Sequence, residues 1–313
     1  MTDPVVECVP NFSEGTDEDV VRAIVQAMRV DGVKLLDWSM DAAHNRSVVT
    51  VAGTPQAVVE SAVRGVGMAA ARIDLTRQRG VHPRMGAADV VPFVPVHGVT
   101  LEQCALLARQ AGGEIWRRHR IPVYYYGAAA SRPDRANLED VRRGQFEELR
   151  ELVLHDAART PDLGGPALHP TAGATAVGAR RFLAAFNIYF DTTDVSCVRQ
   201  MARRIRASSG GLPGVKAMGV LVHGQAQLSM NLTDLQAVSL SKAYDRAAEL
   251  ALEYRLAPVR TELIGLLPEA ACERDAEWMR LSIEFDPATK VIERRWQNPM
   301  EWPTALAVAA EGN

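Results

Sequence analysis

The order of the predicted elements is the feature that most limits how this chain can fold. Short apolar runs alternate with segments of helical periodicity in the order strand, helix, strand, strand, helix, strand. The strands are predicted at 5–10, 33–38, 47–52 and 90–96, with helices opened by Thr16 and by Pro55. This order is that of the split βαβ, or ferredoxin-like, arrangement. The two prolines within 90–96 predict an irregular or edge strand there.

The same order occurs a second time after residue 180, although the two halves share no repeated sequence. Strands are predicted at 182–190, 217–222, 227–232 and 258–265, with one helix capped by Asp194 and another over 239–255. The predicted fold class is therefore α/β (α+β), with two ferredoxin-like βαββαβ subdomains forming an α/β sandwich. A cleft between two such subdomains is a common place for a ligand.

The remaining segments define the predicted domain boundaries. A helix at 100–119, a strand at 123–126 and a helix at 138–152 precede a segment rich in glycine and proline, 162–173, which is the predicted linker. The predicted divisions are 1–178 for the N-terminal subdomain, 179–270 for the C-terminal subdomain and 271–313 for a C-terminal extension. Within that extension, 282–295 resembles a hairpin around Asp286.

Charge and cysteine usage exclude several classes of protein. The formal net charge of -3 provides no overall positive field for nucleic acid. No apolar window approaches the roughly 18 residues of a membrane helix, and no signal pattern opens the chain. The four cysteines and seven histidines lack metal-ligand or redox spacing. We therefore predict a cytoplasmic protein that takes small-molecule partners and binds no metal, membrane or nucleic acid.

Three loops carry residues suited to chemistry. The segment 80–89 contains His82, which can exchange a proton near neutral pH, and Arg84, whose guanidinium can hold a carboxylate. Asp89 either orients the imidazole or caps a turn. The segment 41–47 offers its polar side chains to a ligand or makes an Asx-type turn. The glycines of 164–174 either admit a flat ligand or serve a plain connector.

Several longer motifs occur in one order along the chain. They are ECVPNFSEG at 7–15, NRS at 45–47, HPRMGA at 82–87, PFVPV at 92–96, GAT and VGAR within 173–180, and AFN at 185–187, followed by GG at 210–211, VKAMG at 215–219, SMNL at 229–232 and the pairs EL and GL within 262–266. Together they resemble the glutamate formimidoyltransferase family, as a divergent member, over about residues 4–270.

The resemblance implies a specific activity. The family transfers a formimino group from N-formimino-L-glutamate to N5 of tetrahydrofolate, which serves as co-substrate, and its members form homodimers. The catalytic histidine of the family, a general acid and base, corresponds to His82. The residues expected to bind the amino-acid substrate are Arg84, Asn45, Arg46 and Asp41. The folate-contacting loop corresponds to Gly164, Gly165, Pro166, Ala167, Leu168, His169, Pro170, Thr171, Ala172 and Gly173.

Two departures from the family pattern lie close to the expected chemistry. Val81 and Ala128 stand where the family usually has acidic residues. A formimino group is a cationic amidinium, for which carboxylates are natural partners. Two alternatives therefore remain open: a divergent formimino- or formyltransferase that acts on a different amine, and a non-catalytic folate-binding protein.

Overall fold

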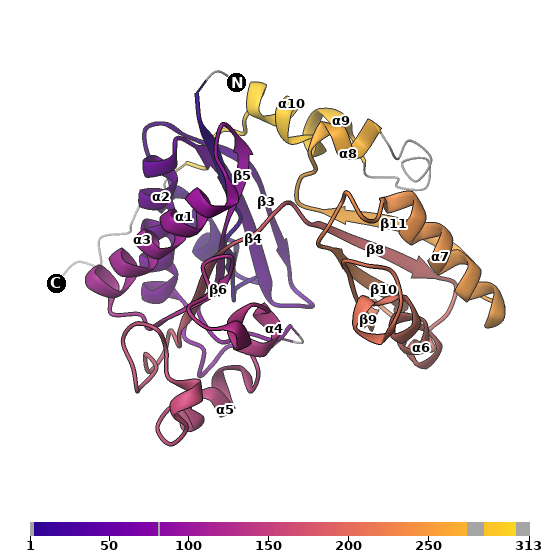
Figure 1. Ribbon diagram of the computed structural model, residues 1–313, viewed down its shortest axis with the longest axis horizontal. Coiled ribbons are helices and arrows are strands. Elements are labelled where there is room, and N and C mark those ends of the chain that lie inside the picture. Colours follow the sequence, from indigo (N-terminus) through magenta and orange to yellow (C-terminus); the bar gives the residue numbers. More distant parts are fainter. Residues whose placement is uncertain (1–2, 81, 274–284, 305–313) are drawn as a thin grey trace. The chain divides into compact units, whose positions relative to one another are not determined.

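The computed structural model describes residues 3–80, 82–273 and 285–304, which form two compact units (Figure 1). The first unit comprises Met1–Arg180 and Pro299–Asn313, and the second comprises Arg181–Asn298. The sequence-based divisions fell at residues 178 and 270 instead. Each unit is described by itself below. The model is of the mixed α/β class predicted from the sequence.

The first unit contains a ferredoxin-like sheet that has been extended on one side. Four antiparallel strands follow the order β3, β4, β1 with its continuation β2, and β5. Two further strands, β7 and β6, pair in parallel beyond β5. The bounds are β1 (Val5–Cys8), β2 (Asn11–Phe12), β3 (Val33–Asp41), β4 (Arg46–Gly53), β5 (Ala88–His97), β6 (Val123–Gly127) and β7 (Thr175–Ala179).

Of the two alternatives predicted for 90–96, the edge strand was wrong, whereas the irregular strand is confirmed by register shifts in its pairing with β1 and β2. β5 lies inside the sheet, between β1 with β2 on one side and β7 on the other. Its prolines are tolerated because they face irregularities of the neighbouring strand. Pro95 pairs with Val6 at a register shift, and Pro92 lies opposite the break between β1 and β2, where Val9 N–H donates to its carbonyl. Proline, which lacks an N–H, is compatible with a sheet at such bulges.

Three helices cover one face of this sheet: α1 (Glu18–Ala27), α2 (Pro55–Arg72) and α3 (Leu101–His119) (Figure 1). Asp17, rather than the predicted Thr16, caps α1, because its carboxylate accepts from the N–H groups of Asp19 and Val20. Thr100 and Gln103 form a capping box at α3. The apolar faces of the helices and strands bury one continuous core.

The segment 138–152 forms two short helices rather than the single one predicted. α4 (Leu138–Val141) and α5 (Gln145–Leu152) are separated at Gly144, whose φ of 90° lies in the left-handed region. A break there is natural because glycine adopts that conformation without steric cost. Short 3₁₀ helices flank the pair at Pro133–Arg135 and Ala157–Arg159. These elements bury a second cluster against β6 and β7.

The glycine- and proline-rich segment 162–173 is not the linker between the units. It belongs to the first unit, where Leu163 exchanges backbone hydrogen bonds with Val123, and Thr171 accepts from Leu75 N–H. The chain then enters β7, a strand that the sequence analysis missed. The passage into the second unit follows β7, between residues 180 and 181.

The second unit has the ferredoxin-like topology without additions. Its antiparallel sheet has the order β11-β8-β10-β9, and α6 and α7 pack on one face. The type I′-like turn at His223 and Gly224, both with positive φ, joins β9 to β10. The bounds are β8 (Ala184–Phe190), α6 (Val195–Ile205), β9 (Val215–Val222), β10 (Gln225–Leu232), α7 (Leu240–Glu253) and β11 (Pro258–Ile264), with a 3₁₀ helix at Ala207–Ser209.

The hairpin predicted around Asp286 was wrong for the described residues. Asp286 caps α9 (Pro287–Lys290), which is followed by α10 (Ile292–Gln297), while α8 (Glu269–Glu273) precedes them. Proline at the first helical position favours this outcome. Residues 282–284 of that prediction lie outside the described residues. Beyond α10 the chain rejoins the first unit, where Met300 N–H donates to Leu35.

None of the helices in the described ranges is long and apolar enough to span a bilayer.

Candidate active site

The segment that carries His82 connects α2 to β5 and is held at both ends. Arg84 is 7% exposed, and it anchors the segment to α5. Its guanidinium donates to both carboxylate oxygens of Glu147, at 2.7 and 2.9 Å, and also to the side chain and carbonyl of Gln78. Its own carbonyl accepts from Phe146 N–H. The hydrogen-bond donors of Arg84 therefore already have protein partners. Its predicted role in binding substrate stays a prediction.

His82 lies against two guanidinium groups. Arg46, at the start of β4, donates from Nη1 to Nε2 of His82 at 2.7 Å. The pKa of His82 is lowered to about 2, first by burial and then by the charges of Arg46, Arg142 and His44. His82 is therefore neutral at physiological pH. A neutral imidazole is the form that accepts a proton, but its Nε2 lone pair is already engaged by Arg46.

The turn between β3 and β4 brings its polar residues to the same place. Asp41 accepts from His44 N–H at 2.9 Å and lies 2.7 Å from His44 Nδ1, and the His44 ring meets His82 edge to face at a centroid distance of 6.2 Å. Asn45 has a φ of 48° and accepts from Gly15 N–H. Asp41 and Asn45 therefore make the turn, and their contact with substrate stays a prediction.

Asp89 and Arg142 form a buried ion pair beside His82. Arg142 follows α4, and its Nη2 lies 2.6 Å from Oδ2 of Asp89, whose Oδ1 accepts from Met85 N–H at 2.8 Å. Asp89 thus stabilises the turn that leads into β5. Of the two roles that the sequence left open for Asp89, turn capping is the one these contacts support. Arg142 was not anticipated from the sequence.

A narrow crevice opens at His82. Its walls approach so closely that no water-sized sphere fits between them. A substrate therefore requires the walls to move apart or to release a contact. Besides His82, the lining residues are Phe12, Ser13, Asn45, Arg46, Arg84 and Asp89.

The predicted folate loop lies next to the His82 segment. Ala172 accepts from Ala87 N–H, Ala174 N–H donates to Met85, and Gly173 forms a bridge with Gly86. His169 Nδ1 accepts from Ala172 N–H at 3.0 Å, which folds the loop back on itself. Residues 165–167 at its tip are exposed. The structure thus brings together two segments that the sequence separates by about 80 residues.

A polar cluster lies on the sheet of the second unit. Glu262 alternates with the core residue Leu263, so it projects from the face opposite the helices. Its Oε2 accepts from Asn187 Nδ2 at 3.0 Å and from the Tyr189 hydroxyl at 3.1 Å. The guanidinium of Arg260 stacks on the Tyr189 ring, 3.4 Å from its centroid. Asn187 and Glu262 lie in two motifs of the sequence analysis, but no role was predicted for either, and Tyr189 and Arg260 were not named.

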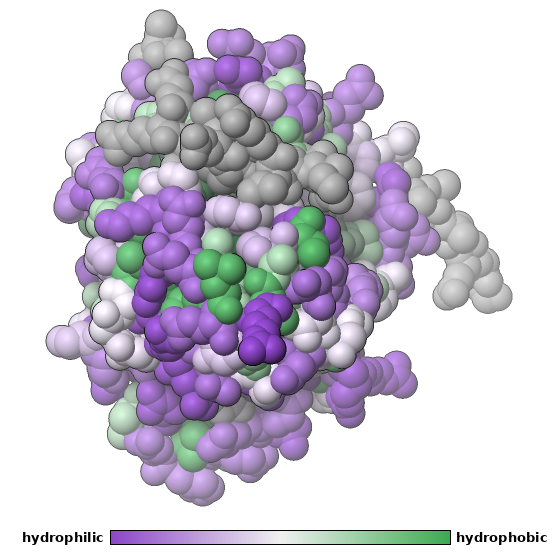
Figure 2. Space-filling view, turned by 90° about the vertical axis from the view of Figure 1, so that its right-hand side faces the viewer, coloured by the Kyte–Doolittle hydropathy of each residue, from purple (hydrophilic) through white to green (hydrophobic). Residues whose placement is uncertain are grey.

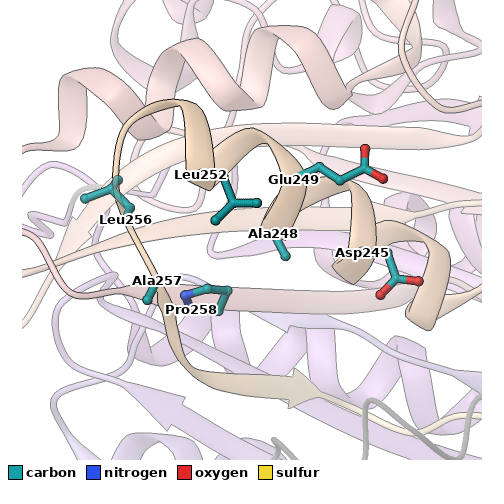
Figure 3. Close-up of a pocket in the computed structure, with 7 residues that line it drawn as sticks. All are labelled: Asp245, Ala248, Glu249, Leu252, Leu256, Ala257 and Pro258. Atoms are coloured by element: carbon teal, nitrogen blue, oxygen red, sulfur yellow. The ribbon is translucent and has the colours of Figure 1, made fainter.

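A shallower hollow of about 490 Å³ lies along α7 and the start of β11 (Figure 3). Aliphatic side chains form most of its surface, and Asp245 and Glu249 stand at one end. Leu252 is 75% exposed there. Apolar residues are few among the hydrophilic ones on this side of the protein (Figure 2). The hollow contains no histidine or nucleophile, so we do not assign the chemistry to it. In the described ranges, no three His, Cys, Asp or Glu side chains gather as metal ligands would.

The fold and the His82 crevice define a two-unit α/β protein with one candidate acid-base site. Comparison with known proteins agrees with the motifs that surround this site. Residues 5–180 match the family model of the formiminotransferase domain, N-terminal subdomain, and residues 185–293 match that of the formiminotransferase domain. The chain belongs to the formiminotransferase family.

Named relatives make the family relationship more specific. Glutamate formimidoyltransferase of Streptococcus pyogenes serotype M1 is 41% identical over 292 residues, which cover 92% of this chain and 97% of the relative. Glutamate formimidoyltransferase of Thermoplasma acidophilum is 40% identical and covers 94% of this chain and 97% of its own. Formimidoyltransferase-cyclodeaminase of Rattus norvegicus is 40% identical, and the match spans 92% of this chain but 59% of that longer protein.

Proposed function

We propose that this protein transfers the formimino group of N-formimino-L-glutamate to N5 of tetrahydrofolate. The observation that carries the proposal is a neutral histidine in a crevice, on the HPRMGA motif of a chain 41% identical to a glutamate formimidoyltransferase along nearly its whole length. In the reaction, the N5–carbon bond forms and the carbon–nitrogen bond to glutamate breaks. The products are L-glutamate and 5-formiminotetrahydrofolate.

In this proposal His82 moves the proton. It accepts the proton that N5 loses as N5 attacks the formimino carbon, and it returns a proton to the departing amine of glutamate. One imidazole can do both in turn because it alternates between its two protonation states. Such a group typically contributes roughly 10²–10⁴-fold to the rate. Holding two substrates in the correct geometry supplies the remainder.

The loop 164–173 is the proposed contact for the co-substrate. Its exposed tip is free of the hydrogen bonds that tie its C-terminal end to residues 85–87. A flat pterin ring suits a segment that presents glycine, since a residue without a side chain allows close approach to the backbone.

The missing acidic residues bear on the choice of donor. Ala128 follows β6, its side chain is exposed, and its N–H donates to Ala179. Val81 lies outside the described residues. A donor other than formiminoglutamate, or binding of folate without catalysis, therefore stays an alternative that the assay below separates.

The deciding experiment is transfer from N-formimino-L-glutamate to tetrahydrofolate, followed by mass spectrometry, with wild type beside His82→Ala. We expect product from the wild type and a rate lower by about 10²–10⁴-fold in the variant. Folate binding without product in either protein would overturn the formimino donor, and a panel of formyl and formimino amines would follow. An unchanged rate in His82→Ala would overturn the role of His82.

The homodimer implied by the family resemblance and the cytoplasmic location inferred from the sequence remain predictions. Light scattering on the purified full chain tests the first.

A further inference from the structure

Two guanidinium groups near His82 hold N–H donors that find no partner in the described part of the chain. Nε of Arg46 and Nε of Arg142 are both inaccessible to water, and neither makes a hydrogen bond. Buried donors are normally satisfied, because leaving one unpaired costs roughly 1–3 kcal/mol. Two such donors beside one catalytic candidate therefore need an explanation, and an anionic ligand would supply it.

Of the two guanidinium groups near His82, Arg142 has a carboxylate in contact, and the described residues place none in contact with Arg46. Arg46 comes from β4 and Arg142 from the end of α4. Asp89 of β5 lies 2.6 Å from Arg142. Asp41, at the end of β3, is held by His44, so its carboxylate is committed to the turn. Burial and the charge of Arg142 lower the pKa of Arg46 to about 10, which is the response of a cation that lacks a full counter-charge.

We propose that Arg46 and Arg142 form a subsite for a substrate carboxylate, and that filling this subsite draws Arg46 away from Nε2 of His82 and frees the base. The proposal rests on the proposed function. In the free protein, Nη1 of Arg46 donates to Nε2 at 2.7 Å, so the lone pair that would accept the N5 proton is occupied. A carboxylate is a stronger acceptor than a neutral imidazole and fits the fork of a guanidinium.

The consequence is a base that becomes available only when substrate is present. An added negative charge next to His82 stabilises its protonated form, so the carboxylate raises the pKa of the imidazole from its low value in the free protein. The carboxylate can come from the amino-acid donor or from the glutamyl part of the folate.

The test follows the His82 ring by ¹⁵N NMR in the full-length protein, with the resonance assigned by comparison with His82→Asn. Saturating glutarate, a dicarboxylate without an amine, is expected to raise the apparent pKa of His82 by about two units and to change the Nε2 shift at constant pH. Glutarate binding without any change at Nε2 overturns the proposal.

Substitutions test the two arginines. Arg46→Met and Arg142→Met are each expected to weaken glutarate binding about tenfold or more, and Arg46→Met should also abolish the effect of glutarate on Nε2. Arg46→Lys keeps the positive charge but lacks the forked guanidinium, and it replaces Arg46→Met in the test if that variant does not fold. It should bind glutarate more weakly than the wild type does. Arg117→Met is the matched control, because Arg117 pairs on the surface with Glu114. Equal binding by the control and the Arg46 and Arg142 variants overturns the subsite.

Three ligands, each tested without glutarate, identify the source of the carboxylate. If the folate supplies it, a folate with its glutamyl group shifts the His82 resonance and pteroic acid does not. If the donor supplies it, L-glutamate alone shifts the resonance and neither folate does. If glutarate has no effect although formiminoglutamate is converted, the subsite fails and the transferase stands. If glutarate acts but no transfer occurs, the proposed function fails and the subsite stands.

Discussion

At the scale of the residue, Arg84 has a side chain suited to ligand binding, but its guanidinium forms hydrogen bonds to other residues of the protein. Its fork holds Glu147 while its Nε holds Gln78. We expect Arg84→Met to lower the free energy of unfolding by roughly 2–3 kcal/mol, since hydrogen bonds to a buried charged group are lost. Urea denaturation measures the effect.

Glu147→Gln is the matched variant, because it removes the charge from the exposed end of the same ion pair, 57% exposed. It should cost well under 1 kcal/mol. If Arg84 instead binds the substrate carboxylate, Arg84→Met would leave stability near that of wild type while KM rises sharply.

His82 makes the stability of the protein depend on pH in a defined direction. Burial, Arg46 and Arg142 lower its pKa from 6.5 to about 2 in the folded chain. Between these values the unfolded chain binds more protons, so stability falls as the pH falls below 6.5. A difference of one full proton between the unfolded and the folded chain changes the free energy of unfolding by about 1.4 kcal/mol per pH unit. This value is an upper bound, because water screens a ring that is not fully buried.

The measurement is urea unfolding from pH 7 to pH 4. We expect His82→Asn to show a shallower loss of stability than wild type, and the exposed His155→Asn to follow the wild type. Parallel curves for wild type and His82→Asn would mean that His82 titrates normally in the folded protein.

A candidate site residue can be recognised from the sequence when the residues that mark it lie close to it along the chain. His82, Asp41, Asn45 and Arg46 were chosen as candidates because each lies in a short polar loop between predicted elements. Arg142 was not found, since it follows a helical segment and resembles any solvated arginine until the fold sets it against Asp89. The pairing of Arg84 with Glu147 was hidden for the same reason.

At the scale of the element, local rules succeeded where packing agreed with them. The sequence predicted the ferredoxin-like order of both units and the cap at Asp194. β7 was missed because it is buried along its whole length and built of small residues, so it lacks the alternation of a half-buried strand. The prolines of β5 led to the wrong prediction of an edge strand, because the bulges that accept them can be seen only in the pairing with the neighbouring strands.

The contact between the His82 segment and the folate loop requires glycine at position 86. A Cβ there would stand 2.0 Å from the carbonyl oxygen of Ala174, and backbone cannot yield as a flexible side chain can. We expect Gly86→Ala to destabilise the protein by roughly 2–3 kcal/mol. The loop should also become more sensitive to protease.

Gly113→Ala provides the contrast, because nothing lies within 4 Å of the added carbon in the middle of α3. Alanine should stabilise the helix by up to about 1 kcal/mol. Thermal unfolding of the two variants in parallel checks both signs, and similar losses in the two would refute the steric argument for Gly86.

At the scale of the whole molecule, the boundaries of the second unit follow from packing that leaves little trace in the sequence. The predicted division at residue 270 came from the end of the strand pattern and of the family motifs. The structure continues the unit through α8, α9 and α10 to residue 298. Leu267 donates to the Lys290 carbonyl and accepts from Ile292 N–H, and Cys272 and Val291 enter its core.

This difference gives a test with two fragments of the same chain. We expect 181–298 to fold cooperatively, because it contains the complete sheet, both helices and their own core. The shorter 181–270 should be less stable by on the order of 3–5 kcal/mol, since it loses the buried side chains of Cys272 and Val291 and uncovers Leu267. Equal urea midpoints would mean that the C-terminal helices contribute little to the stability of the unit. A lower midpoint for 181–270 would mean that they complete its core, and that domain boundaries drawn from strand patterns alone end too early in this chain.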